Sequence, residues 1–174
     1  MRWLPFQLNP DLPEDGITRE EYVARKFGAR GKGVNERVTM AGRQVGIPFA
    51  YEKMKIQPNT LHTHRLMHFA ERAGKQNELA EELFRAHFTE GANLTDRESL
   101  AGIAARAGLD RKETADYLAG DADRDQIARA EVEARSAGIG GVPFFIFNRK
   151  VGVSGAQDPE ALLQAMEQAL NSSD

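Results

Sequence analysis

The stretch GIGGVPFFIFNRKVGVSGAQ, residues 138–157, decides the fold of this chain. A glycine-rich approach ends at Val142-Pro143 and leads into four consecutive apolar residues, 144–147. Asn148-Arg149 then separates this run from a second short segment, 150–153. Two such segments joined by two residues, of which the asparagine tolerates positive φ, predict a β-hairpin. Four apolar residues in a row predict a first strand that is covered on both faces.

Pro143 stands directly before the first strand. It has no N–H group and therefore fits the beginning of a strand rather than its interior. A peptide bond that precedes proline is the only kind in which the cis isomer costs little, and the glycines around Val142-Pro143 give the backbone room for it. The residues alone leave the isomer of this bond open.

The rest of the chain is mostly helical in pattern. Residues 2–8 alternate between apolar and other residues, which predicts a strand, and Pro5 places that strand at a sheet edge. Thr18 and Glu21 form a capping box at the start of a helix. Asp158 and Pro159 mark the start of the last one. Periodicity and capping residues together predict helices at 18–27, 34–45, 60–74, 77–88, 96–107, 110–118, 123–137 and 159–170.

Composition sets limits on function. The chain has 174 residues, of which 41% are hydrophobic, enough for one buried domain or for a domain with an insertion. A net charge of -3 gives no general attraction to nucleic acid or to anionic lipid. No apolar run reaches the roughly twenty residues of a membrane span, and no signal-peptide pattern stands out. We therefore expect a cytoplasmic protein with neither a nucleic-acid partner nor a membrane.

Four patterns in the sequence suggest a functional site, but the details of each pattern do not support one. His64 and His68 have helical metal-ligand spacing, but the sequence marks no third ligand, so we expect no metal. Asp121, Asp123 and Asp125 lack the glycine and the glutamate of a calcium loop. The glycine-rich segment 28–33 lacks the Lys-Ser or Lys-Thr end of a phosphate loop. Ser154 has no base partner marked in the sequence, so we expect no catalytic residue among these groups.

Taken together, these residues resemble the DsbA family, in particular its FrnE-like cytoplasmic branch, which is similar to 2-hydroxychromene-2-carboxylate isomerases and kappa-class glutathione transferases. The resemblance covers nearly the whole chain in the family's order. It is carried by RWLPFQLNPDLP at 2–13, EYVARKFG at 21–28, NTLHTHRL at 59–66, LFRAHFTEG at 83–91 and GVPFFIFNRKVGVSGAQ at 141–157.

This resemblance implies an α/β, helix-dominated protein with a thioredoxin-like fold. It implies an incomplete thioredoxin-like domain at 1–15 and 138–174, an inserted helical domain at 16–137, and a cis bond between Val142 and Pro143. In the family the backbone beside this proline binds an extended peptide or glutathione. The implied binding residues are Gly141, Val142 and Pro143, with Ser154, Gly155 and Gln157 as weaker candidates for contacts to glutathione. Apart from glutathione as a ligand, no cofactor is implied.

The chain also departs from the family. Family members begin with a strand, a Cys-x-x-Cys motif and a helix, and the first cysteine is the nucleophile of thiol–disulfide exchange. This chain contains no cysteine. We therefore expect an N-terminally truncated thiol-disulfide oxidoreductase that is redox-inactive as given, its central sheet strand absent between residues 2–8 and the hairpin.

Two alternatives remain open. One is a non-catalytic module that binds a peptide or glutathione. The other is a relative of the glutathione-dependent isomerases, whose functional serine occupies the same absent position. A self-paired or swapped strand at residues 2–8 would also allow a homodimer.

Overall fold

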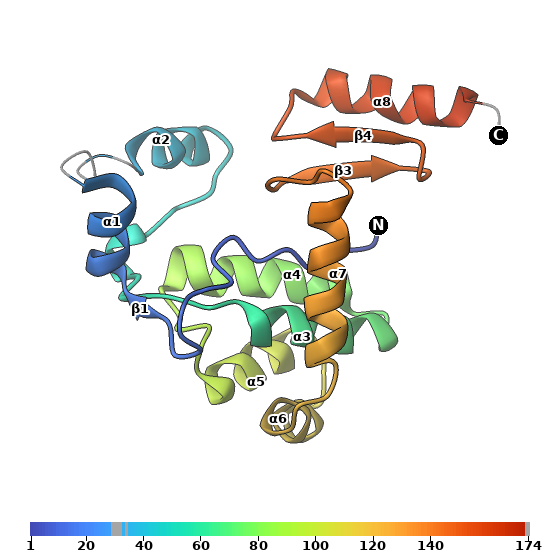
Figure 1. Cartoon of the computed structure of the whole chain (residues 1–174). Helices are drawn as coiled ribbons and strands as arrows, with labels where there is room; N and C mark the ends of the chain where they lie inside the picture. The colour runs from blue at the N-terminus through green and yellow to red at the C-terminus, as the bar shows by residue number, and fades with distance from the viewer. Residues whose placement is uncertain (29–32, 34, 173–174) are drawn as a thin grey trace. The chain divides into compact units, whose positions relative to one another are not determined.

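The computed structural model describes residues 1–28, 33 and 35–172 (Figure 1). Most of the segment that we weighed as a phosphate loop, residues 29–32, lies outside them. The chain divides into two compact units, Met1–Ile127 and Ala128–Asp174, and helix α7, Arg124–Ser136, spans the boundary. The predicted domains, an incomplete thioredoxin-like domain at 1–15 and 138–174 and an inserted helical domain at 16–137, stay a prediction.

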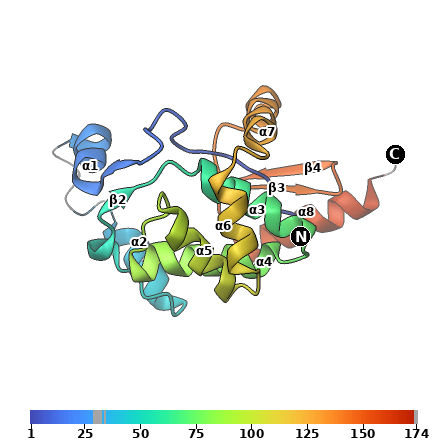
Figure 2. The same cartoon turned by 90° about the horizontal axis from the view of Figure 1, so that it is seen from below.

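The core of the first unit is built from short helices that follow one another closely. These are α3 (Leu61–Arg72), α4 (Gln76–Arg85), the π-helix η3 (Ala86–Glu90), α5 (Arg97–Arg106) and α6 (Arg111–Ala119), seen from below in Figure 2. Leu66, Leu79, Leu100 and Leu118 are fully buried among them. Each side chain comes from a different helix, so their contacts join the four into one core.

The remaining elements of this unit lie between residues 17 and 57. Helix α1 (Arg19–Phe27) begins at Thr18, whose hydroxyl accepts a hydrogen bond from the Glu21 N–H, as the capping box predicts. Helix α2 is Glu36–Gln44, and a 3₁₀ turn, η2, is Tyr51–Lys53. Two strands that the sequence did not predict, β1 (Ile17–Thr18) and β2 (Ile56–Gln57), pair antiparallel. None of the helices in the described part of the chain has the length and apolar character that a membrane crossing requires.

The strand predicted at residues 2–8 is wrong. This segment has no secondary structure, and the Gln76 side chain satisfies the Trp3 backbone instead. Gln76 Oε1 accepts from the Trp3 N–H at 2.9 Å, and Gln76 Nε2 donates to the Trp3 carbonyl at 3.1 Å.

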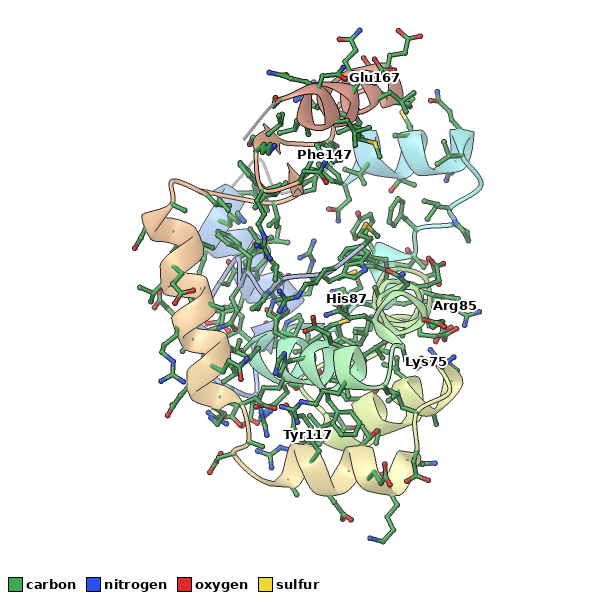
Figure 3. The ribbon with its side chains drawn as sticks, turned by 90° about the vertical axis from the view of Figure 1, so that its right-hand side faces the viewer. Lys75, Arg85, His87, Tyr117, Phe147 and Glu167 are labelled. Carbon is green, nitrogen blue, oxygen red and sulfur yellow. The ribbon has the colours of Figure 1, made fainter. Side chains whose placement is uncertain are left out.

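A buried arginine holds the loop after α6. Arg65 is fully buried and donates to the carbonyl oxygens of Tyr117 at 3.0 Å, Gly120 at 2.6 Å and Ala122 at 2.8 Å. The Tyr117 hydroxyl donates to the Arg65 carbonyl at 3.1 Å, so Tyr117 lies against α3 (Figure 3). A cation can be buried only where several acceptors replace its water. The last turn of α6 and the loop between α6 and α7 supply those acceptors.

A histidine and a glutamate extend this network to the N-terminal segment. His62 Nδ1 lies 2.8 Å from Arg65 Nη1, and His62 Nε2 lies 2.6 Å from Glu14 Oε1. Arg97 and Arg124 also donate to the Glu14 carboxylate. The hydrogen bonds from Arg124 and His62 lower the pKa of Glu14 to about 2. Burial lowers the pKa of His62 because it disfavours the charged ring. The neutral ring is also the form that can accept a hydrogen bond from Arg65 at Nδ1.

The second unit contains the hairpin and the last helix. Strands β3 (Phe144–Phe147) and β4 (Val151–Ser154) pair antiparallel, with Phe147 opposite Val151. The turn is therefore one residue longer than predicted, because Lys150 donates its N–H to the Phe147 carbonyl and β4 begins at Val151. Helix α8 (Pro159–Asn171) packs mainly along β4 (Figure 1).

Candidate functional site

The Val142–Pro143 peptide bond is cis, the isomer that the resemblance implies. It stands at the end of the hairpin away from the turn. Here the Gly155 N–H donates to the Pro143 carbonyl at 2.8 Å, and Phe144 lies opposite Ser154. The fold thus brings the two ends of the stretch 138–157 together at one edge of the sheet.

The structure gathers the other predicted residues around this point. Gly141 and Val142 precede the proline in the chain, and the Val142 side chain is 46% exposed. Gly155 follows Ser154 with a φ of +83°, a conformation that suits glycine. The Gln157 amide turns back and donates to the Ser154 carbonyl at 2.9 Å. The candidate set therefore forms one continuous surface at the end of the hairpin.

The hairpin has an unpaired edge along β3. Backbone groups of successive residues in an antiparallel strand point alternately to one neighbour and to the other. Since the Pro143 carbonyl accepts from Gly155, Phe145 and Phe147 also direct their backbone groups toward β4. Phe144 and Ile146 then direct theirs to the opposite edge, where the described part of the chain provides no strand.

The two faces of the hairpin differ. Phe145 and Phe147 stack with ring centroids 6.4 Å apart and share a face with Val151 and Val153. Ile146, on the other face, is 50% exposed. The expectation of a strand covered on both faces is therefore wrong. An apolar run predicts burial, but within the described residues nothing covers this face fully.

Sequence reasoning also missed the part played by Gly152. A Cβ atom at this position would lie 3.0 Å from the Phe144 ring, which is closer than ordinary contact. The glycine lets that ring lie over β4 beside the cis-proline. The sequence did indicate this role, since a glycine inside a strand often marks the close approach of another group.

The groups that this chain places at the site are these. The chain has no cysteine, and its four histidines, at 62, 64, 68 and 87, all lie in the first unit. Ser154 thus has neither a thiol beside it nor an imidazole in its own unit to act as its base. Among the described residues no cluster of three potential metal ligands occurs. What the site offers is a row of backbone donors and acceptors beside exposed apolar side chains.

Comparison with known proteins agrees with this architecture. The family model of the DSBA-like thioredoxin domain matches residues 1–167. The crystal structure of a probable DsbA oxidoreductase from Streptomyces coelicolor superimposes with a TM-score of 0.87 at 29% identity. The match covers 97% of this chain and 74% of that one. No curated protein matches the sequence.

Proposed function

Because the chain belongs to the family of DSBA-like thioredoxin domains, we propose that it binds an extended polypeptide by strand addition at the open edge of β3, without thiol–disulfide exchange of its own. The observation that carries this proposal is the edge itself. Phe144 and Ile146 direct backbone groups away from β4, directly beside the cis-proline. Within the family we propose the FrnE-like branch, on the sequence stretches quoted above.

Strand addition satisfies these groups in the way that a neighbouring strand does. Each backbone hydrogen bond contributes about 0.5–1.5 kcal/mol, and alternate side chains of the added strand provide specificity. Val142 and Ile146, each about half exposed, offer apolar contacts for those side chains. A polypeptide with apolar residues at alternate positions fits this surface.

A polypeptide suits the site better than glutathione does. The donors that were candidates for glutathione are already engaged, since the Gly155 N–H binds the Pro143 carbonyl and the Gln157 amide binds the Ser154 carbonyl. A ligand at that end would have to displace bonds within the protein. At the edge of β3 the described part of the chain provides no strand that a ligand would have to displace.

A pair of proline variants tests the proposal. The N–H of Ile146 faces the open edge, so Ile146→Pro removes one donor from the site and leaves the ladder with β4 intact. Phe145→Pro removes a ladder donor instead and serves as the matched control for damage to the fold. We expect Ile146→Pro to weaken binding of a fluorescein-labelled Lys-Val-Thr-Val-Ser-Val-Lys peptide about two- to tenfold, the equivalent of one hydrogen bond. Fluorescence anisotropy measures the affinity, and circular dichroism verifies folding.

Unchanged peptide affinity in a folded Ile146→Pro variant would show that the edge is not the binding site. Two assays test the remaining parts of the proposal. In the insulin assay, a dithiol reduces the insulin disulfides at a certain rate by itself. Addition of the purified chain is expected to leave that rate unchanged. Calorimetric titration with glutathione is expected to show no heat of binding, and a saturable signal would favour the glutathione alternative.

A further inference from the structure

The first unit contains a cavity that the proposed function does not use. It has a volume of about 540 Å³ and lies between α2 and the η2 turn. Sites for small ligands fall in this size range, about 300–1,000 Å³. Its described lining includes Thr39, Met40, Phe49 and Tyr51, with Glu36, Arg43 and Glu52 as the charged members.

The aromatic part of the lining is held in place from behind. Phe49 stacks on Tyr51 at 5.4 Å, and Phe88 of η3 meets the Phe49 ring edge-on at 5.9 Å. The Ala50 N–H donates to the Phe88 carbonyl at 2.8 Å, which ties this wall to the helical core. A wall that is fixed in this way loses little freedom when a ligand binds.

Helix α2 is fitted closely against the same wall. Gly42 is buried, and a Cβ atom there would lie 2.5 Å from the Phe49 ring. The Ile47 N–H donates to the Gly42 carbonyl at 2.8 Å and turns the chain after the helix back toward Phe49. The glycine therefore allows α2 to approach the aromatic wall closely, and the two line a cavity that is open to solvent.

The charges of the lining favour a cation. Glu36 and Glu52 contribute two negative charges and Arg43 one positive charge. Within the described part of the chain none of these three side chains forms an ion pair. Beside them Met40 is 63% exposed, and Val38 and Ile47 on the same segment are also exposed. A complementary ligand carries a positive charge next to apolar groups and extends beyond the cavity.

We propose that this cavity is a second polypeptide-binding site, which takes a lysine or arginine side chain whose neighbours in the bound segment are apolar. The cation lies between the carboxylates and the Tyr51 ring, where a cation–π contact adds to the ion pairs. The neighbouring apolar side chains cover Met40, which lines the cavity and is exposed. The site does not depend on the edge of β3, and the two can be tested separately.

Two labelled peptides that differ in one residue test this proposal. The first has a Ser-Leu-Arg-Phe-Ser centre, and the second has glutamate in place of arginine. We expect anisotropy titrations of the full chain to show at least about fivefold tighter binding of the arginine peptide, an advantage that falls as salt rises. Glu52→Gln is expected to reduce that preference about two- to fivefold, since exposed ion pairs contribute little each. Glu113→Gln, an exposed glutamate on α6, is the matched control and is expected to leave the preference unchanged.

Charge reversal gives the sharpest outcome. Glu52→Lys is expected to abolish the preference for the arginine peptide, and because the side chain is exposed the variant is expected to fold. Equal binding of the two peptides by the wild-type chain would overturn the proposal, as would a preference that survives charge reversal. The Ile146→Pro variant is expected to retain the full preference, so failure at the edge of β3 and failure at this cavity are distinguishable.

Discussion

At the scale of single residues, the network around His62 carries a defined consequence for acid stability. The ring is almost fully buried and has Arg65 on one nitrogen and Glu14 on the other, with Arg97 3.4 Å from Nε2. Protonation would place a hydrogen on Nδ1, which faces the Arg65 guanidinium. It would also make the ring a cation that lies between the positive charges of Arg65 and Arg97. The folded protein therefore favours the neutral ring.

This preference predicts a loss of stability in acid. Burial holds the pKa of His62 in the folded chain below its unfolded value of about 6.5, so the unfolded chain binds a proton first as pH falls. The stabilisation is fully present above pH 6.5 and is lost as pH falls from there through the folded pKa. Urea unfolding at pH 7.5 and pH 5 measures it. The glutamine of His62→Gln provides one hydrogen-bond acceptor and one donor but has no group that titrates in this pH range. In this variant the free energy of unfolding is expected to differ less between pH 7.5 and pH 5.

A substitution that removes the ring altogether complements this experiment. His62→Leu leaves buried donors of Arg65 unpaired and is expected to cost about 1–3 kcal/mol at pH 7.5. Equal pH dependence in the wild-type chain and His62→Gln would rule out His62 as the acid-sensitive group.

At the scale of elements, helix starts were the most predictable feature. Thr18, Asp96 and Asp110 were each read from the sequence at the start of a helix, and each accepts a hydrogen bond from an N–H of the first turn. Capping succeeds as a predictor because donor and acceptor lie within three residues of each other. The prediction of a strand at residues 2–8 was wrong for the opposite reason. Their partner, Gln76, is more than seventy residues away, and alternation alone does not identify it.

The caps can be tested individually. Asp96 accepts from the N–H groups of both Glu98 and Ser99, so Asp96→Ala is expected to lower the free energy of unfolding by about 0.5–2 kcal/mol. Asn35 precedes α2 but makes no capping hydrogen bond with its side chain. Asn35→Ala is therefore expected to have a smaller effect in the same denaturant titration. If Asn35→Ala lowered the free energy of unfolding as much as Asp96→Ala does, the stabilisation could not be attributed to the capping hydrogen bonds.

The candidate site was predictable only in part. The motif around Val142-Pro143 located it, because those residues are neighbours in the chain or across one hairpin. The open edge of β3 was not predictable, since it depends on which other strands are present. The aromatic wall of the second cavity was also missed, because Phe49 and Phe88 lie far apart in the sequence.

At the scale of the whole molecule, the two units differ in how much they bury. The first unit contains fully buried leucines from four helices. In the second unit the described side chains that are most buried include Ala165 and Ala169, and the larger apolar side chains of β3 remain partly exposed. Burial of apolar area is the main source of folding free energy. The second unit therefore gains less folding free energy from buried apolar area than the first.

This difference predicts unequal protection from hydrogen exchange. Amide hydrogens of β3 and β4 are expected to exchange faster than those of α3 and α5, because local opening requires the exposure of less apolar surface. Exchange followed by mass spectrometry on peptides from each unit measures the two rates. Saturation with the Lys-Val-Thr-Val-Ser-Val-Lys peptide is expected to slow exchange in β3 in particular. Equal protection of the two units without peptide would contradict the reasoning from burial.

The open edge of β3 has one further consequence. A strand of sequence FFIF with an open edge combines high β-propensity with the absence of charge, two features of segments that stack into fibrils. Arg149 and Lys150, exposed in the turn at one end of the strand, oppose such stacking by mutual repulsion. The edge that we propose to bind a polypeptide is thus also the site most prone to aggregation, and we expect a bound polypeptide to protect the protein from self-association.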